Sequence, residues 1–285
     1  MKIKKRALKL WLLLIVILAA AYFLFHSHHR TSDVYTFSNN LFSYSESRPY
    51  PVAEVVGIND SENYTLSELI IQSRGAKLSA YLLVPKAKPQ HSQQVGIALL
   101  AGAGVDKNGE LGFAKALAGE GFTVLTYDQR STGKTVVERT TQEPESHKSV
   151  YDALAAFDYL RESKNIGRVL MAGESLGGRT AIIAASMEKR IYGVLAVSTS
   201  GYGPVADPYY YSINPDNYFS GLKGRKIAFV HSTSDTVIPI QYAQQTFTRA
   251  AEPKKFFQLS GCTHGFCSEM KPSVMEALDW VLNNS

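Results

Sequence analysis

The sequence has few cysteines, no internal repeat and, beyond its first residues, almost no net charge. Residues 1–30 hold six Lys or Arg and no acidic residue, so the remainder carries 24 basic and 25 acidic side chains, a net charge of −1. That balance argues against a protein that binds nucleic acid through its phosphates. Two cysteines in 285 residues permit at most one intrachain disulfide bridge. The length fits one α/β domain with an added N-terminal segment.

The basic N-terminus precedes an apolar run, Leu10–Phe25, of sixteen residues without a charge. A spanning helix usually needs about 17–25 residues, and this run reaches that length if the two apolar residues before Lys9 join it. We expect residues 1–30 to be a cytoplasmic tail and a single-pass membrane anchor that places the following domain outside the cytoplasmic membrane. The alternative is a cleaved signal peptide, with a mature chain that begins at Tyr22. Both interpretations export the domain.

Residues 31–51 are rich in Ser, Asn and Tyr and show little periodicity, so we expect a tether there. Residues 52–285 show the periodicity of a folded domain. Two strands, Thr65–Gln72 and Lys77–Val84, are separated by a turn that predicts an antiparallel hairpin. After it strands and helices alternate, with strands near residues 95–100, 122–127, 168–172, 192–197, 226–231 and 255–259, and helices near residues 109–120, 149–161, 179–187, 240–250 and 273–282. This order predicts a mostly parallel sheet with helices on both faces.

The segment 200–224 interrupts the alternation. It contains six aromatic residues and three prolines. Such a composition is typical of a short lid over a substrate pocket, and equally of a surface loop that packs on its own tyrosines. The interval is too short to hold a large cap domain.

A short turn, Gly173-Glu174-Ser175-Leu176-Gly177-Gly178, joins an apolar strand to an Ala-rich and Ile-rich helix. Gly-x-Ser-x-Gly between a strand and a helix is the pattern of a nucleophile elbow, where small residues let strand and helix approach closely. The helix N-terminus would face negative charge that develops near Ser175. We therefore predict that Ser175 is a nucleophile.

A serine nucleophile needs an imidazole that takes its proton and a carboxylate that orients this imidazole. Asp235 follows the predicted strand 226–231, and His264 follows the predicted strand 255–259. Loops at the carboxyl ends of parallel strands meet at one edge of a sheet, and Ser, Asp, His is the chain order of such a site. His231 is the competing base, but it lies at a strand end only four residues before Asp235.

The oxyanion of an acyl-transfer reaction needs two backbone N–H donors. We expect one from Leu176, directly after the nucleophile, and the other from Ala103 in the small-residue loop that follows the strand 95–100. A simple tight turn in that loop would explain the same small residues.

These motifs resemble the α/β-hydrolase superfamily over about residues 52–285. The segment Tyr127–Thr135 is similar to the Asp-x-Arg-Gly-x-Gly-x-Ser loop of the serine-aminopeptidase-like and monoacylglycerol-lipase-like branches. The resemblance implies that Asp128 and Arg130 brace loops near the site and do not react. Two residues depart from the pattern, because Ser131 replaces a glycine and Ala101 replaces the histidine of the usual His-Gly turn.

Cys262 and Cys267 lie on either side of His264. In an exported protein they would form a disulfide that stiffens the histidine loop, whereas in a reducing compartment they would be two buried thiols.

Together these residues predict an exported, membrane-anchored serine hydrolase that forms an acyl-enzyme from a small carboxylic ester, with no metal and no organic cofactor. A peptidase or amidase is the first alternative and would need an anchor for a substrate amine, such as Glu174 or Asp207. A non-catalytic binding protein on a hydrolase scaffold is the second. Acyl-chain length and oligomeric state are not determined by the sequence.

Overall fold

The computed structural model describes residues 34–86, 94–138 and 141–283. The chain divides into two compact units, Met1–Arg48 and Pro49–Ser285. The apolar run Leu10–Phe25 lies outside the described residues. Among the residues that are described, none of the helices combines the length and the apolar character that crossing a membrane requires.

The described part of the first unit is a hairpin of β1 (Tyr35–Ser38) and β2 (Leu41–Tyr44). Within residues 31–51, for which we expected a tether with little periodicity, the structure therefore has two paired strands. Asn39 and Asn40 both adopt positive φ, 53° and 59°, as a two-residue turn of the I′ type requires. Aromatic side chains on both strands lie within ring-contact distance, including Tyr35 and Tyr44 at 5.5 Å between centroids. The paired asparagines between aromatic residues were the sequence signal for this hairpin.

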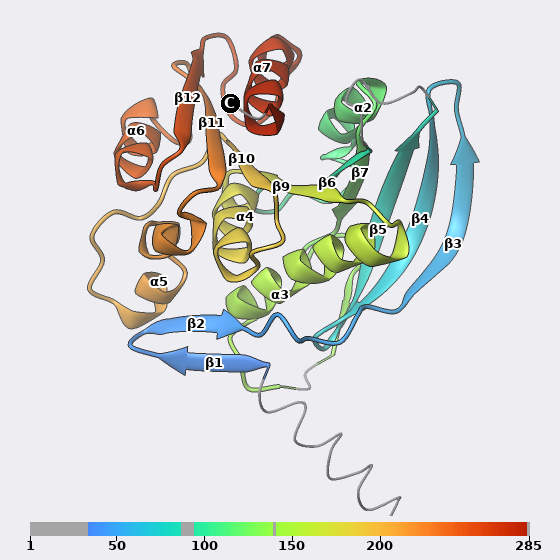
Figure 1. Ribbon diagram of the computed structural model, residues 1–285, viewed down its shortest axis with the longest axis horizontal. Coiled ribbons are helices and arrows are strands. Elements are labelled where there is room, and N and C mark those ends of the chain that lie inside the picture. Colours follow the sequence, from blue (N-terminus) through green and yellow to red (C-terminus); the bar gives the residue numbers. More distant parts are fainter. Residues whose placement is uncertain (1–33, 87–93, 139–140, 284–285) are drawn as a thin grey trace, which may run out of the picture. The chain divides into compact units, whose positions relative to one another are not determined.

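The second unit is built on one ten-stranded sheet with the order β12-β11-β10-β9-β6-β7-β5-β4-β3, in which β8 also pairs with β5. Its strands are β3 (Ala53–Asp60), β4 (Tyr64–Ser73), β5 (Ala76–Pro85), β6 (Val95–Leu100), β7 (Thr123–Tyr127), β8 (Val136–Val137), β9 (Arg168–Glu174), β10 (Gly193–Val197), β11 (Lys226–Ser232) and β12 (Lys254–Leu259). Strands β6, β7 and β9 to β12 run parallel, and β3 to β5 form an antiparallel extension at the other edge (Figure 1). The predicted parallel sheet with an N-terminal antiparallel hairpin is confirmed.

The helices of this unit are α2 (Leu111–Gly119), α3 (Glu145–Asp158), α4 (Leu176–Met187), α5 (Pro208–Ser212), α6 (Ile240–Arg249) and α7 (Lys271–Leu282). A π-helical turn, η1 (Tyr159–Ser163), extends α3, and two 3₁₀ turns, η2 (Pro215–Asn217) and η3 (Phe219–Leu222), follow α5. A third 3₁₀ turn, η4 (Ser268–Met270), leads into α7. The helices α2 and α7 cover one face of the sheet, and α3 and α4 pack against each other on the opposite face (Figure 1).

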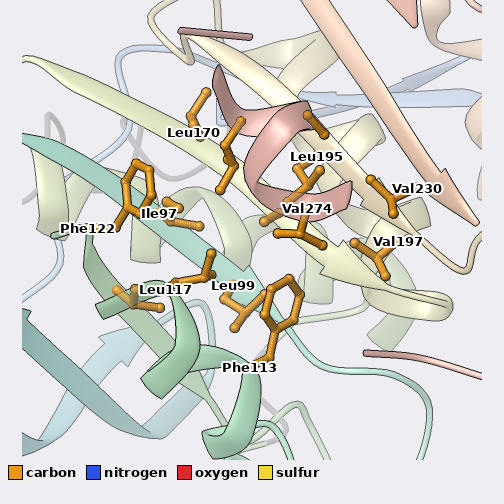
Figure 2. Packing of buried hydrophobic residues seen from close by; sticks show 14 of the residues in the cluster. Ile97, Leu99, Phe113, Leu117, Phe122, Leu170, Leu195, Val197, Val230 and Val274 are labelled. Carbon is orange, nitrogen blue, oxygen red and sulfur yellow. The ribbon is translucent and has the colours of Figure 1, made fainter. Parts of the chain in front are cut away.

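The core under α2 and α7 follows directly from the apolar strands. Figure 2 shows Ile97 and Leu99 of β6 with Leu195 of β10 beneath Phe113 of α2 and Val274 of α7. All five side chains are buried. Continuous apolar runs such as β6 are typical of parallel strands with both faces covered, and burial at about 25 cal/mol per Å² makes this cluster a main source of stability.

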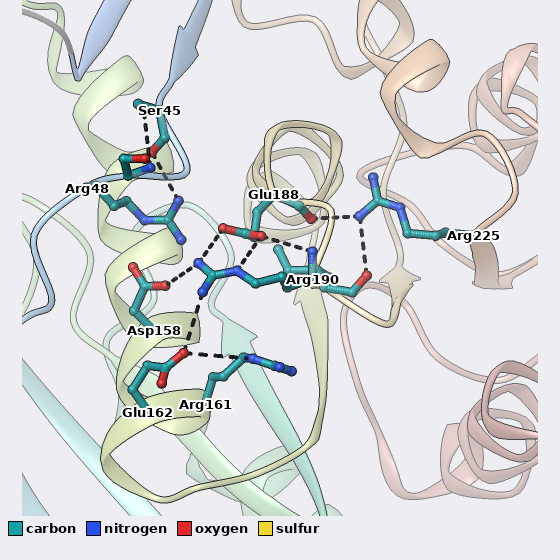
Figure 3. Close-up of polar contacts among 10 residues, drawn as sticks. Ser45, Arg48, Asp158, Arg161, Glu162, Glu188, Arg190 and Arg225 are labelled. Atoms are coloured by element: carbon teal, nitrogen blue, oxygen red, sulfur yellow. Dashed lines mark hydrogen bonds and ion pairs between the residues drawn. The ribbon is translucent and has the colours of Figure 1, made fainter.

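Buried polar contacts join the far ends of α3 and α4. Arg190 donates to Glu188 at 2.8 Å and to Asp158 at 3.4 Å, and both carboxylates are buried (Figure 3). These contacts lie away from the carboxyl ends of the parallel strands, so they serve the fold and leave the candidate site to other residues.

Strand β3 was not expected from the sequence. It forms the antiparallel edge of the sheet, with a register shift between Val55 and Gly57. Its apolar side chains are exposed, with Val55 at 52% and Ile58 at 70%. Because neither face of β3 is consistently covered, its sequence carries no period-two alternation, which is the usual signal of a half-buried strand.

Candidate active site

The sheet topology places the candidate site between β6 and β9. From β6 the chain continues to β7 on one side, and later returns as β9 on the other side of β6. Ligands of open parallel sheets bind at the carboxyl ends of strands at such a switch point. The Ser175 turn follows β9 there, and the loop that contains Ala103 follows β6.

Ser175 has the strained backbone of a nucleophile elbow, with φ 50° and ψ −114° between β9 and α4. A non-glycine residue with positive φ costs energy and persists only where its surroundings enforce it. A Cβ atom at Gly173 would collide with the backbone of Gly177, and one at Gly177 would collide with the Leu100 carbonyl. The glycines of the motif are therefore required by close approach of β9, α4 and β6, as the sequence predicts.

Asp235 and His264 lie in hydrogen-bond contact. His264 Nδ1 is 2.9 Å from Asp235 Oδ2 and 3.0 Å from Oδ1. The Asp235 side chain is fully buried, and its Oδ1 also accepts the N–H groups of Val237 and Ile238 at 2.9 and 2.8 Å. The carboxylate is therefore fixed, and it can hold the His264 ring with Nδ1 protonated and Nε2 free as a base.

The His264 loop reaches the Ser175 turn through Glu174. Phe266, two residues after His264, donates its N–H at 2.7 Å to Oε1 of Glu174, which is the residue before Ser175. Gly265 adopts φ 69°, and a Cβ atom there would come within 2.9 Å of Glu174 Oε2. No hydrogen bond joins the Ser175 hydroxyl to His264 among the described residues, and catalytic hydrogen bonds are often long without substrate.

His231 lies in a different environment. It is 1% exposed, and its Nε2–H donates to the Ile238 carbonyl at 2.8 Å, while Asp235 Oδ2 is 3.5 Å away. Burial lowers the pKa of His231. Its ring is thus committed to the loop backbone, which favours His264 over His231 as the base.

The two candidate oxyanion donors come from the start of α4 and from the loop after β6. Leu176 is the first residue of α4, and the first N–H groups of a helix have no intrahelical acceptor. In the loop after β6, a Cβ atom at Gly102 would lie 3.7 Å from Ser175 Cβ, and the exposed Ala103 follows. Gln129 Nε2 donates to the Ala101 carbonyl and holds this loop at its start.

Two acidic side chains lie near the site, of which Glu110 is buried and Glu174 is half-buried. Burial raises the pKa of Glu174, and burial together with the Glu174 charge raises the pKa of Glu110 well above its usual value. Glu110 Oε1 has no hydrogen-bond partner among the described residues. Glu174 positions the His264 loop, so its part in the site is structural.

Cys262 and Cys267 form a disulfide with 5.9 Å between their Cα atoms. The bridge closes the loop that carries His264. Hydrogen bonds also tie this loop to the Asp235 loop, from Thr236 N–H to the Thr263 carbonyl at 2.7 Å and from Gly261 N–H to Ser234 Oγ at 3.2 Å. Both loops of the Asp235–His264 pair are thereby held together.

The segment Tyr127–Thr135 braces the site, as the family resemblance implies. Asp128 is fully buried and accepts from Lys107 N, Lys107 Nζ and Lys134 N, each at 2.7 Å. It thus joins the loops after β6 and β7. Ser131 has φ 64°, the left-handed conformation that the family's glycine adopts freely.

The segment 200–224 has features of both interpretations. Tyr218 and Phe219 are buried, as in a self-packed loop. Tyr202 and Ile213 instead line a cavity of about 70 Å³ that also borders Leu176. The part of this segment near Ser175 therefore covers a pocket, and the rest anchors it.

Part of the chain is similar in sequence to known proteins. Residues 92–209 match the family model of the serine aminopeptidases, S33. The uncharacterized protein YfhR of Escherichia coli K12 is 23% identical over 156 residues, which cover 50% of this chain and 53% of YfhR. The chain thus spans about half the length of the curated relatives it matches.

Solved structures share the fold over most of the chain. An acetyl xylan esterase from Paenibacillus sp. R4 superposes with a TM-score of 0.66 at 15% identity, covering 82% of this chain and 90% of its own. The esterase Pf2001 of Pyrococcus furiosus gives 0.60 at 21% identity, covering 82% and 100%. Est1E of Butyrivibrio proteoclasticus, solved with ferulic acid, gives 0.61 at 18% identity, covering 75% and 97%. At these identities the likeness establishes the fold, and the predicted resemblance to the α/β-hydrolases is confirmed.

Proposed function

We propose that this chain, which has the α/β-hydrolase fold and resembles the serine aminopeptidases over residues 92–209, is a serine hydrolase of the esterase-like kind that hydrolyses small carboxylic esters. One observation carries the proposal. Ser175 occupies a strained turn at the end of β9, and the hydrogen-bonded pair Asp235–His264 comes from the loops after β11 and β12. This combination supports nucleophilic catalysis by serine with a histidine base.

In the proposed mechanism Ser175 Oγ attacks the ester carbonyl carbon, and its proton passes to His264 Nε2. Asp235 accepts the Nδ1–H of His264 and stabilises the imidazolium. The N–H groups of Leu176 and Ala103 stabilise the oxyanion. His264 then protonates the departing alkoxide, which leaves an acyl group on Ser175. A water molecule releases the acid by the same steps, with His264 as the base.

The amide alternative has less support from the surroundings. Of the two carboxylates considered as anchors for a substrate amine, Glu174 accepts from Phe266 N–H, and Asp207 accepts from Tyr209 and Tyr210 N–H at 2.9 and 3.1 Å. Both are already used by the fold.

A substrate panel tests the proposal. We expect residues 31–285, purified with the disulfide intact, to hydrolyse short-chain aryl and alkyl esters and to label with a fluorophosphonate at Ser175 alone. Aminoacyl amides should be turned over at least tenfold more slowly in kcat/KM. Amides cleaved as fast as matched esters would favour the peptidase, and a protein that neither labels nor hydrolyses would indicate a binding role.

We further propose that Leu10–Phe25 anchors the protein with its hydrolase domain outside the cytoplasmic membrane. The basic start of the chain supports this orientation, and the Cys262–Cys267 disulfide suits an oxidising compartment. Protease added to cells whose outer barriers have been removed, and whose cytoplasmic membrane is intact, should release an active domain from the membrane. A mature chain that begins at Tyr22 would instead support the signal-peptide alternative.

A further inference from the structure

A small cavity lies beside the oxyanion position, between α3, α4 and the segment 200–224. Its volume is about 70 Å³, and its wall includes Leu176, Ile183 and Val150 as apolar residues. Ligand sites are typically lined by apolar residues with some placed polar groups, and here the polar groups are Arg179, Ser146 and Tyr202, together with Gln129, Ser149 and Thr180. The volume suits a short chain of a few non-hydrogen atoms.

Arg179 places a positive charge in this wall. It lies one helical turn after Ser175 on α4, and its N–H donates to the Ser175 carbonyl at 3.3 Å. The guanidinium is held in one orientation, because Nε donates to the Ser200 carbonyl at 2.7 Å and the group stacks over the Tyr202 ring at 4.2 Å. Among the described residues, the Ser200 carbonyl is the protein acceptor of the Arg179 guanidinium, and it takes the Nε–H. The N–H groups on Nη1 and Nη2 are therefore left for a ligand.

Among the residues that the structure describes, Arg179 makes no ion pair with a carboxylate, although its charge acts on Asp216. Asp216, the acidic residue whose pKa responds to the Arg179 charge, pairs with Arg249 at 2.8 Å. A planar guanidinium with the N–H groups of both terminal nitrogens left over is suited to a carboxylate, which it can bind through parallel hydrogen bonds.

Ser146 provides an independent observation. It comes from α3, on the opposite wall, and its hydroxyl is buried without a hydrogen-bond partner among the described residues. A buried hydroxyl without a partner costs free energy, so such groups usually have a ligand or water in the working state. An anionic oxygen in the cavity would accept this hydroxyl.

We propose that this cavity binds a carboxylate carried on the acyl part of the ester, with Arg179 as its anchor. The inference rests on the proposed function and names its substrate class: monoesters of short dicarboxylic acids. The cavity borders Leu176, whose N–H holds the carbonyl oxygen, so it faces the acyl part, whereas the alcohol leaves on the side of His264. The apolar wall contacts the methylene groups between the two carbonyl carbons.

Matched esters test this assignment. Monoethyl succinate and ethyl butyrate present the same alcohol, with and without the carboxylate. At low ionic strength we expect the wild type to favour monoethyl succinate in kcat/KM, and we expect Arg179→Gln to reduce this preference about ten- to hundredfold, the usual range for a charge-assisted hydrogen bond. Arg179→Lys should retain part of the preference, because it keeps the charge and loses the fork. Lys115→Gln, which removes an equal charge from the exposed side of α2, should leave the ratio of the two esters unchanged.

A binding measurement separates the two proposals. Succinate should raise the melting temperature of Ser175→Ala, which cannot turn over, and should not raise that of Ser175→Ala/Arg179→Gln. If the wild type hydrolyses ethyl butyrate as well as monoethyl succinate, or if Arg179→Gln leaves their ratio unchanged, the carboxylate site is overturned while the esterase stands. If no ester is hydrolysed but succinate protects only the protein with Arg179, the esterase fails and the anion site stands.

Discussion

Replacing Ser175 by alanine is expected to lower kcat/KM for ester hydrolysis by about 10⁴-fold or more, because no covalent acyl-enzyme can then form. His264→Ala should cause a loss of similar size. Asp235→Asn should cost about 10⁴-fold in kcat, since an amide in this place favours the wrong tautomer of His264. Steady-state kinetics on a short aryl ester measure all three.

The combined variants distinguish a catalytic unit from three separate effects. Ser175→Ala/His264→Ala should be no slower than Ser175→Ala alone, because the residues act together. His231→Gln is the matched control, because the His231 side chain on β11 donates to the Ile238 carbonyl in the Asp235 loop and takes no part in the proposed mechanism. It should retain most of the activity. If Ser175→Ala keeps full activity, the mechanism is wrong.

Removing the carboxylate of Asp152 is expected to cost about 3–5 kcal/mol of unfolding free energy, the usual effect of breaking a buried ion pair from one side. Asp152 on α3 receives Arg130 Nε at 2.7 Å and Nη2 at 2.8 Å, and both residues are buried. Ser73 Oγ donates to the same carboxylate at 2.5 Å. Asp152→Ala would leave the Arg130 charge buried without its main partner.

The loss should appear as a fall in melting temperature of about 6–20 °C, at 2–4 °C for each kcal/mol in a domain of this size. Urea titration gives the free energy directly. The exposed pair Lys255–Glu276, at 3.4 Å, provides the control, and Glu276→Gln should cost less than about 1 kcal/mol. An Asp152→Ala protein within 1 kcal/mol of the wild type would show that Arg130 is adequately solvated or paired elsewhere.

The parallel half of the sheet was predictable from the sequence because its strands are buried on both faces. The predicted strand at residues 95–100 has the same limits as β6, and the helix predicted from Arg179 begins three residues earlier at Leu176. Turn chemistry predicted the Ser175 elbow, and its glycines are indeed packed against backbone. Local patterns were sufficient here because each required residue type lies within a few positions in the chain.

Features that depend on residues distant in sequence were missed. The use of Glu174 as an acceptor for Phe266 N–H joins positions 92 residues apart, and no local pattern contains it. The Arg130–Asp152 pair was missed for the same reason, although the family resemblance assigned Arg130 a bracing part. The stacking of Phe266 on Phe113, at 4.2 Å, likewise joins the His264 loop to α2 through the folded structure alone.

The covalent closure of the His264 loop affects how substrate range can diverge in proteins of this design. Cys262 and Cys267 are five positions apart, so they close a short ring around His264, and an inserted residue would change the ring and displace the base. The segment between β10 and β11 has no such closure and contributes Tyr202 and Ile213 to the cavity wall. Surface connections of this kind accept insertions at small entropic cost. New specificities, whether evolved or engineered, are therefore expected to arise from changes in residues 200–224, while the length of the histidine loop stays constant.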